Sequence, residues 1–183
     1  MGKKLGVAVI GTGMIANIAH IPAWQALKDQ VEFVGMADIL PERAKATAVS
    51  VGLTADKGYG DPVKMLQECK PDIVSVCTPN CYHKMWTIES LKHGAHVLCE
   101  KPVAPGYADA LEMYKIAEEV GKVLFVGQSS RFMPAAEAAK EIVSTGVLGD
   151  VYYAETSACR RRGVPKWGQF HIKDDNGGGP VYD

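Results

Sequence analysis

A glycine-rich turn near the amino terminus has the residue types and spacing of a phosphate-binding loop. The apolar run Leu5–Ile10 leads directly into Gly11–Ala16 (Gly-Thr-Gly-Met-Ile-Ala), and a helical pattern follows. In this G-x-G-x-x-A arrangement Gly11 permits a tight turn, Gly13 leaves room for a pyrophosphate, and Ala16 lets the helix pack on the strand. The open amides of the helix would face the phosphates. The sequence therefore predicts a dinucleotide site, with a plain strand–helix turn as the alternative.

A carboxylate follows the second apolar run, Val31–Ala37. Asp38 stands about 20 residues after the glycine-rich turn, where a carboxylate can accept hydrogen bonds from both ribose hydroxyls of an adenosine. Its charge repels a 2′-phosphate, so Asp38 favours NAD over NADP. The alternative is a turn or helix-capping aspartate ahead of Pro41. Arg43 lies close enough to bind a 2′-phosphate, which leaves the cofactor preference open.

The third predicted strand of this group, Ile73–Cys77, ends in Thr78-Pro79-Asn80, and His83 follows one helical turn later. Loops after the carboxyl ends of parallel strands are where α/β proteins bind their ligands. These residues are therefore candidates for a binding loop. A helix-entry turn with a surface histidine explains the same residues equally well.

Glu100-Lys101-Pro102 follows the fourth strand, His96–Cys99. A lysine beside a nicotinamide can donate a hydrogen bond to a substrate hydroxyl or carbonyl, and partial burial would lower its pKa and suit it to proton transfer. A cis peptide bond before Pro102 would fix the direction of Lys101. An exposed Glu–Lys pair is the alternative on residue type alone.

The elements that must position these residues alternate between short apolar runs and longer amphipathic stretches, which is typical of βαβ units. The expected strands are Leu5–Ile10, Val31–Ala37, Ile73–Cys77, His96–Cys99 and Val123–Val126. The expected helices are Ile15–Leu27, Pro41–Val51, Pro62–Glu68, His83–His93 and Ala108–Val120. This pattern predicts a doubly wound parallel Rossmann sheet over residues 1–127.

Residues 128–183 have a different pattern. A helix is expected at Pro134–Ser144 and a long strand at Val151–Cys159, before the glycine run Gly177–Gly179. One helix and one strand cannot enclose a core of their own. We therefore expect the beginning of a second, incomplete domain.

The composition narrows the class of protein. Among 183 residues, 20 basic and 21 acidic side chains leave a net charge of -1, which points to neither a nucleic-acid nor a membrane partner. The five cysteines, odd in number and scattered, favour reduced thiols and a cytoplasmic protein over a disulfide framework. Cys77, Cys81 and His83 lack a second ligand pair at zinc spacing, so no metal site is expected.

Several of these segments together resemble the Gfo/Idh/MocA family of nicotinamide-dependent oxidoreductases. The resemblance rests on Thr78-Pro79-Asn80-x-x-His83 and His96-Val97-Leu98-Cys99-Glu100-Lys101-Pro102, and extends from the glycine-rich turn to Gly177-Gly178-Gly179-Pro180. It implies a Rossmann domain followed by a larger α/β domain with an open sheet. It also implies oxidation or reduction of a hydroxyl on a sugar, inositol or related polyol.

The resemblance also implies roles for individual residues. The pyrophosphate would be held by Gly11, Gly13, Met14 and Ile15, and the adenosine ribose by Asp38. Thr78, Pro79, Asn80 and His83 would line the cofactor groove, and Glu100 and Lys101 would lie beside the nicotinamide ribose and the reacting carbon. Arg131 would approach the nicotinamide, and Trp167 lies in a loop that can reach a cofactor. A surface arginine and a packing tryptophan are the alternatives for these last two.

Two departures from the family pattern matter. Met133 stands where the family commonly has Asp, and the chain stops at Asp183, which matches an aspartate four residues before the family's acid/base histidine. Family members are considerably longer, so a fragment or truncated gene product is expected, able to bind NAD but inactive alone. The full-length protein would be a homo-oligomer. Two alternatives remain, an NAD-dependent glycoside hydrolase and a dinucleotide-sensing regulatory protein.

Overall fold

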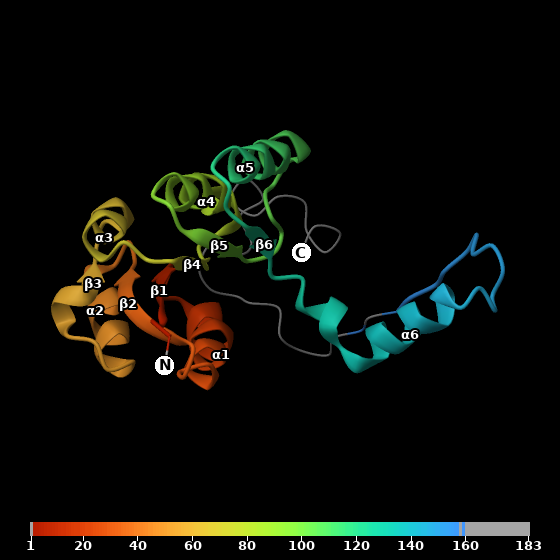
Figure 1. The fold of residues 1–183 in the computed structure, drawn as a ribbon, viewed down its shortest axis with the longest axis horizontal. Coiled ribbons are helices and arrows are strands. Elements are labelled where there is room, and N and C mark those ends of the chain that lie inside the picture. Colours follow the sequence, from red (N-terminus) through yellow and green to blue (C-terminus); the bar gives the residue numbers. More distant parts are fainter. Residues whose placement is uncertain (1, 158, 160–183) are drawn as a thin grey trace.

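Six parallel strands form the centre of the protein in a computed structural model, which describes residues 2–157 and 159 (Figure 1). Their order in the sheet is β3-β2-β1-β4-β5-β6, the doubly wound arrangement that the sequence predicts. The strands are β1 (Leu5–Ile10), β2 (Val31–Ala37), β3 (Gly58–Tyr59), β4 (Ile73–Val76), β5 (His96–Cys99) and β6 (Leu124–Val126). Strand β3 was not expected, because its two residues carry no hydrophobic pattern and are extended only through pairing with Met36 and Ala37.

Helices cover the sheet on two faces. One face carries α3 (Pro62–Cys69), α4 (His83–Lys92) and α5 (Tyr107–Glu119), and the other carries α1 (Ile21–Ala26) and α2 (Pro41–Ser50). Side chains of β1 alternate between the two cores, with Ala8 and Ile10 in the first and Val9 in the second. This alternation is the period of a strand buried on both faces.

The helix after β1 is continuous over residues 14–26 but not regular. A wide π-helical turn, Ala16–His20, precedes α1, whereas the sequence predicts one regular helix over Ile15–Leu27. Pro22 explains the difference, since it lacks an N–H and its ring clashes with the carbonyl one turn earlier. The wider turn accommodates the proline and leaves His20 buried.

The strand register brings the carboxyl ends of three strands together. Ile10 of β1 pairs with Val76 of β4, and Val76 pairs in turn with Cys99 of β5. The loops that follow these strands therefore begin at the same edge of the sheet. This edge carries the glycine-rich turn, the Thr78 loop and the Glu100 loop.

The chain leaves the sheet after β6. Helix α6 (Pro134–Ser144) extends away from the body of the protein, and none of its residues is buried (Figure 1). The strand expected at Val151–Cys159 is wrong for the described part, because residues 151–157 form no strand. Tyr152 and Tyr153 are exposed there, so no neighbouring strand covers them, and an isolated strand has no partner for its backbone groups. Trp167, Asp183 and the glycine run lie outside the described residues.

The cysteines are unbridged, and two of them are buried, Cys99 in β5 and Cys77 directly after β4. Burial raises the pKa of Cys77 well above its ordinary value and that of Cys99 to about 12, so both thiols stay protonated as small apolar groups. Within the described ranges, no cluster of three His, Cys, Asp or Glu side chains is arranged to hold a metal ion. Nor is any described helix long and apolar enough to cross a membrane.

Candidate functional site

The glycine-rich turn has two glycines with different surroundings. Gly11 has a φ of +88°, and a Cβ there would lie 2.7 Å from the carbonyl oxygen of Cys77 at the end of β4. Gly13 faces open space, with no atom within 4 Å of an added Cβ. Gly11 therefore lets two loops pack closely, and Gly13 leaves the cradle that a phosphate group would fill. Beside it Met14 is exposed and Ile15 is half-buried.

Asp38 connects the glycine-rich turn to the end of β2. Its carboxylate is buried and accepts hydrogen bonds from the backbone N–H of Thr12 at 2.8 Å, the hydroxyl of Thr12 at 3.0 Å and the backbone N–H of Leu40 at 2.9 Å. Arg43 adds two more, from Nε at 3.0 Å and from Nη2 at 2.7 Å. Burial acts to raise the pKa of Asp38, but Arg43 and the N–H donors outweigh it, so the pKa lies below the ordinary value.

These contacts occupy the whole Asp38 carboxylate. A carboxylate offers about four lone-pair sites, and the donors on Thr12, Leu40 and Arg43 fill them. Of the two side chains that donate to Asp38, that of Thr12 is buried and that of Arg43 is partly exposed, so Arg43 can leave without unfolding a backbone turn. Asp38 can therefore accept ribose hydroxyls only after Arg43 has moved aside.

The Thr78 loop is tied down by His83. The His83 side chain is fully buried, with Nδ1 2.7 Å from the carbonyl oxygen of Pro102 and Nε2 2.9 Å from that of Thr78. It therefore shapes the loop from beneath and presents none of its own surface to a ligand. The Thr78 hydroxyl oxygen is buried and has no partner among the described residues, and Pro79 is exposed beside it. Asn80 begins the short turn Asn80–Tyr82.

Glu100 and Lys101 lie at the end of β5, where the peptide bond between Lys101 and Pro102 is cis, as the sequence hypothesis held. Glu100 Oε1 accepts a hydrogen bond from Nε2 of His20 at 2.9 Å, and Oε2 accepts one from the Lys101 backbone N–H at 3.1 Å. Burial acts to raise the pKa of Glu100, but His20 and Lys101 lower it below its ordinary value. Glu100 is thus a mostly buried anion held by His20, and Lys101 is partly exposed.

His20 is the residue of this site that the sequence reading missed. It follows Ala16 by four positions, so a helical reading places it on the face that packs against the sheet. A polar residue on that face needs a hydrogen-bond partner. A histidine at this position in the sequence was therefore the signal for a buried polar contact. Arg131 is exposed in the turn Ser129–Phe132. Among the described residues, its side chain makes no hydrogen bond to the glycine-rich turn, the Thr78 loop or the Glu100 loop.

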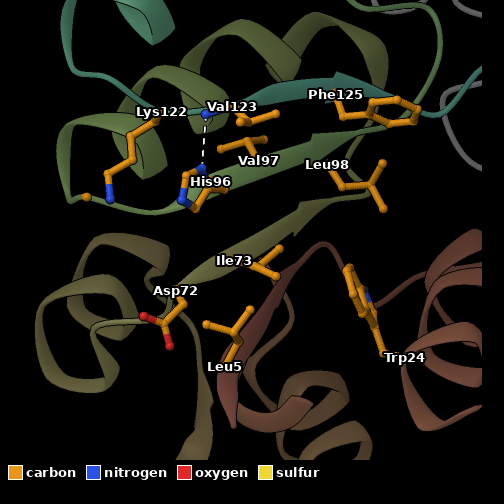
Figure 2. A pocket seen from close by; sticks show the side chains of 11 residues that line it. Leu5, Trp24, Asp72, Ile73, His96, Val97, Leu98, Lys122, Val123 and Phe125 are labelled. Carbon is orange, nitrogen blue, oxygen red and sulfur yellow. Dashed lines mark hydrogen bonds between the residues drawn. The ribbon is translucent and has the colours of Figure 1, made fainter. Parts of the chain in front are cut away.

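A hollow in the described surface lies away from this site. It has a volume of about 560 Å³ and runs along the sheet face opposite α4 and α5, towards the amino ends of the strands. Figure 2 shows Trp24, Leu98 and Phe125 near one end of it and Asp72 and Lys122 near the other. Ligands of doubly wound sheets bind at the carboxyl ends of strands, so we do not assign the dinucleotide to this hollow.

Comparison with known proteins identifies the relatives of the chain. Residues 5–128 match the model of an oxidoreductase family with an NAD-binding Rossmann fold, GFO_IDH_MocA. The chain is 40% identical over 181 residues to the D-glucoside 3-dehydrogenase of Escherichia coli strain K12, a match that covers 99% of this chain and 51% of the relative. The chain therefore spans about half the length of that relative.

Solved structures give the same picture. The WlbA dehydrogenase of Chromobacterium violaceum, in complex with NADH and UDP-GlcNAcA, matches 81% of this chain and 42% of its own at 32% identity, with a TM-score of 0.76. The 3-ketoreductase KijD10 of Actinomadura kijaniata, in complex with TDP-benzene and NADP, matches 79% of this chain and 45% of its own at 26% identity, with a TM-score of 0.71. Both nicotinamide dinucleotides are therefore bound by neighbours of this fold.

Proposed function

This chain belongs to the Gfo/Idh/MocA family of NAD(P)-binding oxidoreductases, and on that premise we propose that it is the cofactor-binding part of a sugar or polyol dehydrogenase. The reaction is the transfer of a hydride between the nicotinamide and a hydroxyl-bearing carbon of the substrate. The sugar-related activities named for its relatives support this substrate class.

One observation carries the proposal. The glycine-rich turn, the buried Asp38 carboxylate and the Glu100–Lys101 segment lie along the same edge of the sheet, joined through Thr12 and through His20. A dinucleotide runs from its adenosine ribose through its pyrophosphate to its nicotinamide end. The order of β2, β1 and β5 in the sheet presents Asp38, the glycine-rich turn and the Glu100–Lys101 segment in that same sequence. Segments distant in the sequence are brought together in the arrangement that an extended dinucleotide requires.

The residues present fit such a cofactor. The open space at Gly13 and the amides of the turn, with Met14 and Ile15, receive the pyrophosphate, and Asp38 receives the ribose once Arg43 has moved. The buried Thr78 hydroxyl, which lacks a partner among the described residues, is a polar group available to the ligand. Pro79 and Asn80 line the same loop. We assign NAD as the preferred cofactor, with NADP accepted through Arg43.

Lys101 is the residue that we assign to the reacting end. The bound nicotinamide supplies the hydride chemistry, and the protein supplies orientation and charge. The Lys101 ammonium would donate a hydrogen bond to the substrate oxygen and stabilise negative charge that develops there. Glu100 holds the Lys101 backbone. Arg131, Trp167 and Asp183 remain candidates for the nicotinamide side and the substrate side.

The experiment that tests this function is a calorimetric titration of NAD and NADP into the chain and into Asp38→Ala. We expect NAD to bind, more tightly than NADP, and to bind at least tenfold more weakly to the variant, since a charge-assisted hydrogen-bond acceptor is lost. Because the chain spans half of its relatives, we expect binding with little or no turnover of sugar. Absence of binding for both dinucleotides would overturn the proposal.

A further inference from the structure

Two buried histidines hold the residues on either side of Lys101. His20 contacts the side chain of Glu100, which precedes Lys101, and His83 contacts the carbonyl group of Pro102, which follows it. Both imidazole rings are more than nine-tenths buried. Neither ring is exposed enough to line a binding surface, and the function proposed above uses neither of them directly.

The contact from His20 reaches Lys101 in two steps. His20 Nε2 donates to Oε1 of Glu100, and Oε2 of the same carboxylate accepts the backbone N–H of Lys101. Because His20 belongs to the turn that follows the glycine-rich loop, this chain of contacts joins the expected pyrophosphate site to the expected nicotinamide site. The Glu100 side chain is mostly buried, so the contact is screened little by water.

The contact from His83 reaches Lys101 from the other side. The ring lies between the carbonyl oxygens of Thr78 and Pro102, and so joins the loop after β4 to the loop after β5. A neutral imidazole donates one hydrogen bond and an imidazolium donates two. Burial is the largest influence on the pKa of His83 and lowers it, Glu100 and the two carbonyls act to raise it, and Lys101 opposes the charged form. In either state the ring keeps at least one donor for these carbonyls.

We propose that His20 and His83 are positioning residues that together fix the backbone of Lys101, and with it the direction of the Lys101 side chain towards the nicotinamide end of the cofactor. This inference rests on the function proposed above, because that function assigns Lys101 to the reacting end. Backbone contacts on both flanks of one residue restrict its rotation, which lowers the entropy lost when the side chain meets a ligand.

The first experiment separates hydrogen bonding from packing. His20→Gln and His83→Gln keep a donor, whereas His20→Phe and His83→Phe keep a ring of similar size without one. His93→Gln is the matched control, since His93 is partly exposed at the end of α4. Its Nδ1 contacts the carbonyl oxygen of Glu89 at 2.8 Å and the carboxylate of the same residue at 3.8 Å, one helical turn earlier and away from Lys101. Each variant is titrated with NADH and with ADP, which carries the adenosine and the pyrophosphate but no nicotinamide.

We expect the Phe variants to bind NADH about tenfold more weakly than the wild type, the Gln variants to retain most of the affinity, and ADP binding to change less than twofold. The control should bind both ligands as the wild type does. Equal losses for NADH and ADP would show a merely structural role and overturn the proposal. So would Phe variants that bind NADH better than their Gln counterparts.

A second readout needs no ligand. The backbone amide signal of Lys101 in a ¹H–¹⁵N correlation spectrum should shift in the His20 and His83 variants and stay in place in His93→Gln. An unmoved Lys101 signal in the folded variants would overturn the positioning role. If the wild type bound neither NADH nor ADP while the Lys101 signal shifted as expected, the proposed function would fail and the positioning contacts would stand.

Discussion

Arg43 and Asp38 form a two-point ion pair, with Nε 3.0 Å from Oδ2 and Nη2 2.7 Å from Oδ1, in which the arginine is about half exposed and the carboxylate is fully buried. In the proposed cofactor site, the pair places a displaceable cation on the carboxylate assigned to the adenosine ribose. Arg43 would then compete with NAD for Asp38 and, once displaced, would contact the 2′-phosphate of NADP. The same side chain would weaken the binding of NAD and strengthen that of NADP.

Substitution Arg43→Ala should separate these effects. NAD should bind up to about fivefold more tightly, because a partly exposed ion pair of about 1 kcal/mol no longer has to be broken. NADP should bind about tenfold more weakly, because a charge-assisted hydrogen bond is lost. Calorimetric titration of both dinucleotides measures the two shifts. Lys45→Ala, which removes an exposed pair with Glu42 on the same helix, is the control. Weaker binding of NAD to Arg43→Ala would contradict the competition.

The two glycines of the turn should respond differently to a methyl group. Gly13→Ala should change the free energy of unfolding by less than about 1 kcal/mol, since its Cβ meets open space, yet weaken dinucleotide binding at least tenfold. Gly11→Ala should cost about 2–4 kcal/mol, from its positive φ and from contact with the Cys77 carbonyl. Urea unfolding and calorimetry measure the pair. If Gly13→Ala bound NAD normally, the pyrophosphate would lie elsewhere.

Stability should fall as the solution is acidified. The native pKa values of His83, Glu100 and Asp38 are lowered from ordinary values of 6.5, 4.5 and 3.8, by burial for His83 and by net hydrogen bonding for the carboxylates. Below each ordinary value the unfolded chain binds a proton that the folded chain does not, so the free energy of unfolding decreases as pH falls towards the native pKa. Urea unfolding between pH 7 and pH 4 measures this. His83→Gln should flatten the part between pH 6.5 and pH 5, and an unchanged slope there would argue against the His83 contribution.

A buried hydroxyl on β4 depends on a tryptophan from α1. Trp24 Nε1 donates to the hydroxyl oxygen of Ser75 at 2.8 Å, and Ser75 is fully buried. Trp24→Phe should lower the free energy of unfolding by about 1–3 kcal/mol, because the serine is left without its donor. The double variant with Ser75→Ala should lose less unfolding free energy than the two single variants lose together. Strict additivity in urea unfolding would show that the hydrogen bond contributes nothing.

The sheet could be predicted from the sequence because its strands are short apolar runs with a clear period. The bounds of β1, β2 and β5 match the expected runs, and β4 and β6 differ from theirs by one residue each. Strand β3 could not be predicted, since Gly58 and Tyr59 are extended only through pairing with β2. The same dependence on a partner explains the wrong strand at residues 151–157, whose aromatic pattern lacks a neighbouring strand.

The loops that carry the site could be predicted from the sequence, but most of the side-chain contacts within it could not. The positions of Asp38 and Lys101 after their strands follow from the βαβ pattern. The pairing of Asp38 with Arg43 and of Glu100 with His20 depends on tertiary geometry, since Glu100 and His20 are 80 residues apart. His83 was expected on the cofactor surface, and its burial beneath two carbonyl groups follows from packing of α4 that no local pattern reveals.

The wide turn before Pro22 has a consequence for how this protein tolerates insertions and deletions. A π-helical turn holds one residue more than the regular turn it replaces. It therefore fixes how the residues before it, including the glycine-rich turn, are rotated about the helix axis relative to α1. Removing a single residue from this stretch would leave the glycine-rich loop and β5 untouched but turn the histidine at position 20 away from its carboxylate. The number of residues between Gly13 and Pro22 therefore determines the contact between His20 and Glu100 as much as the identities of those residues do.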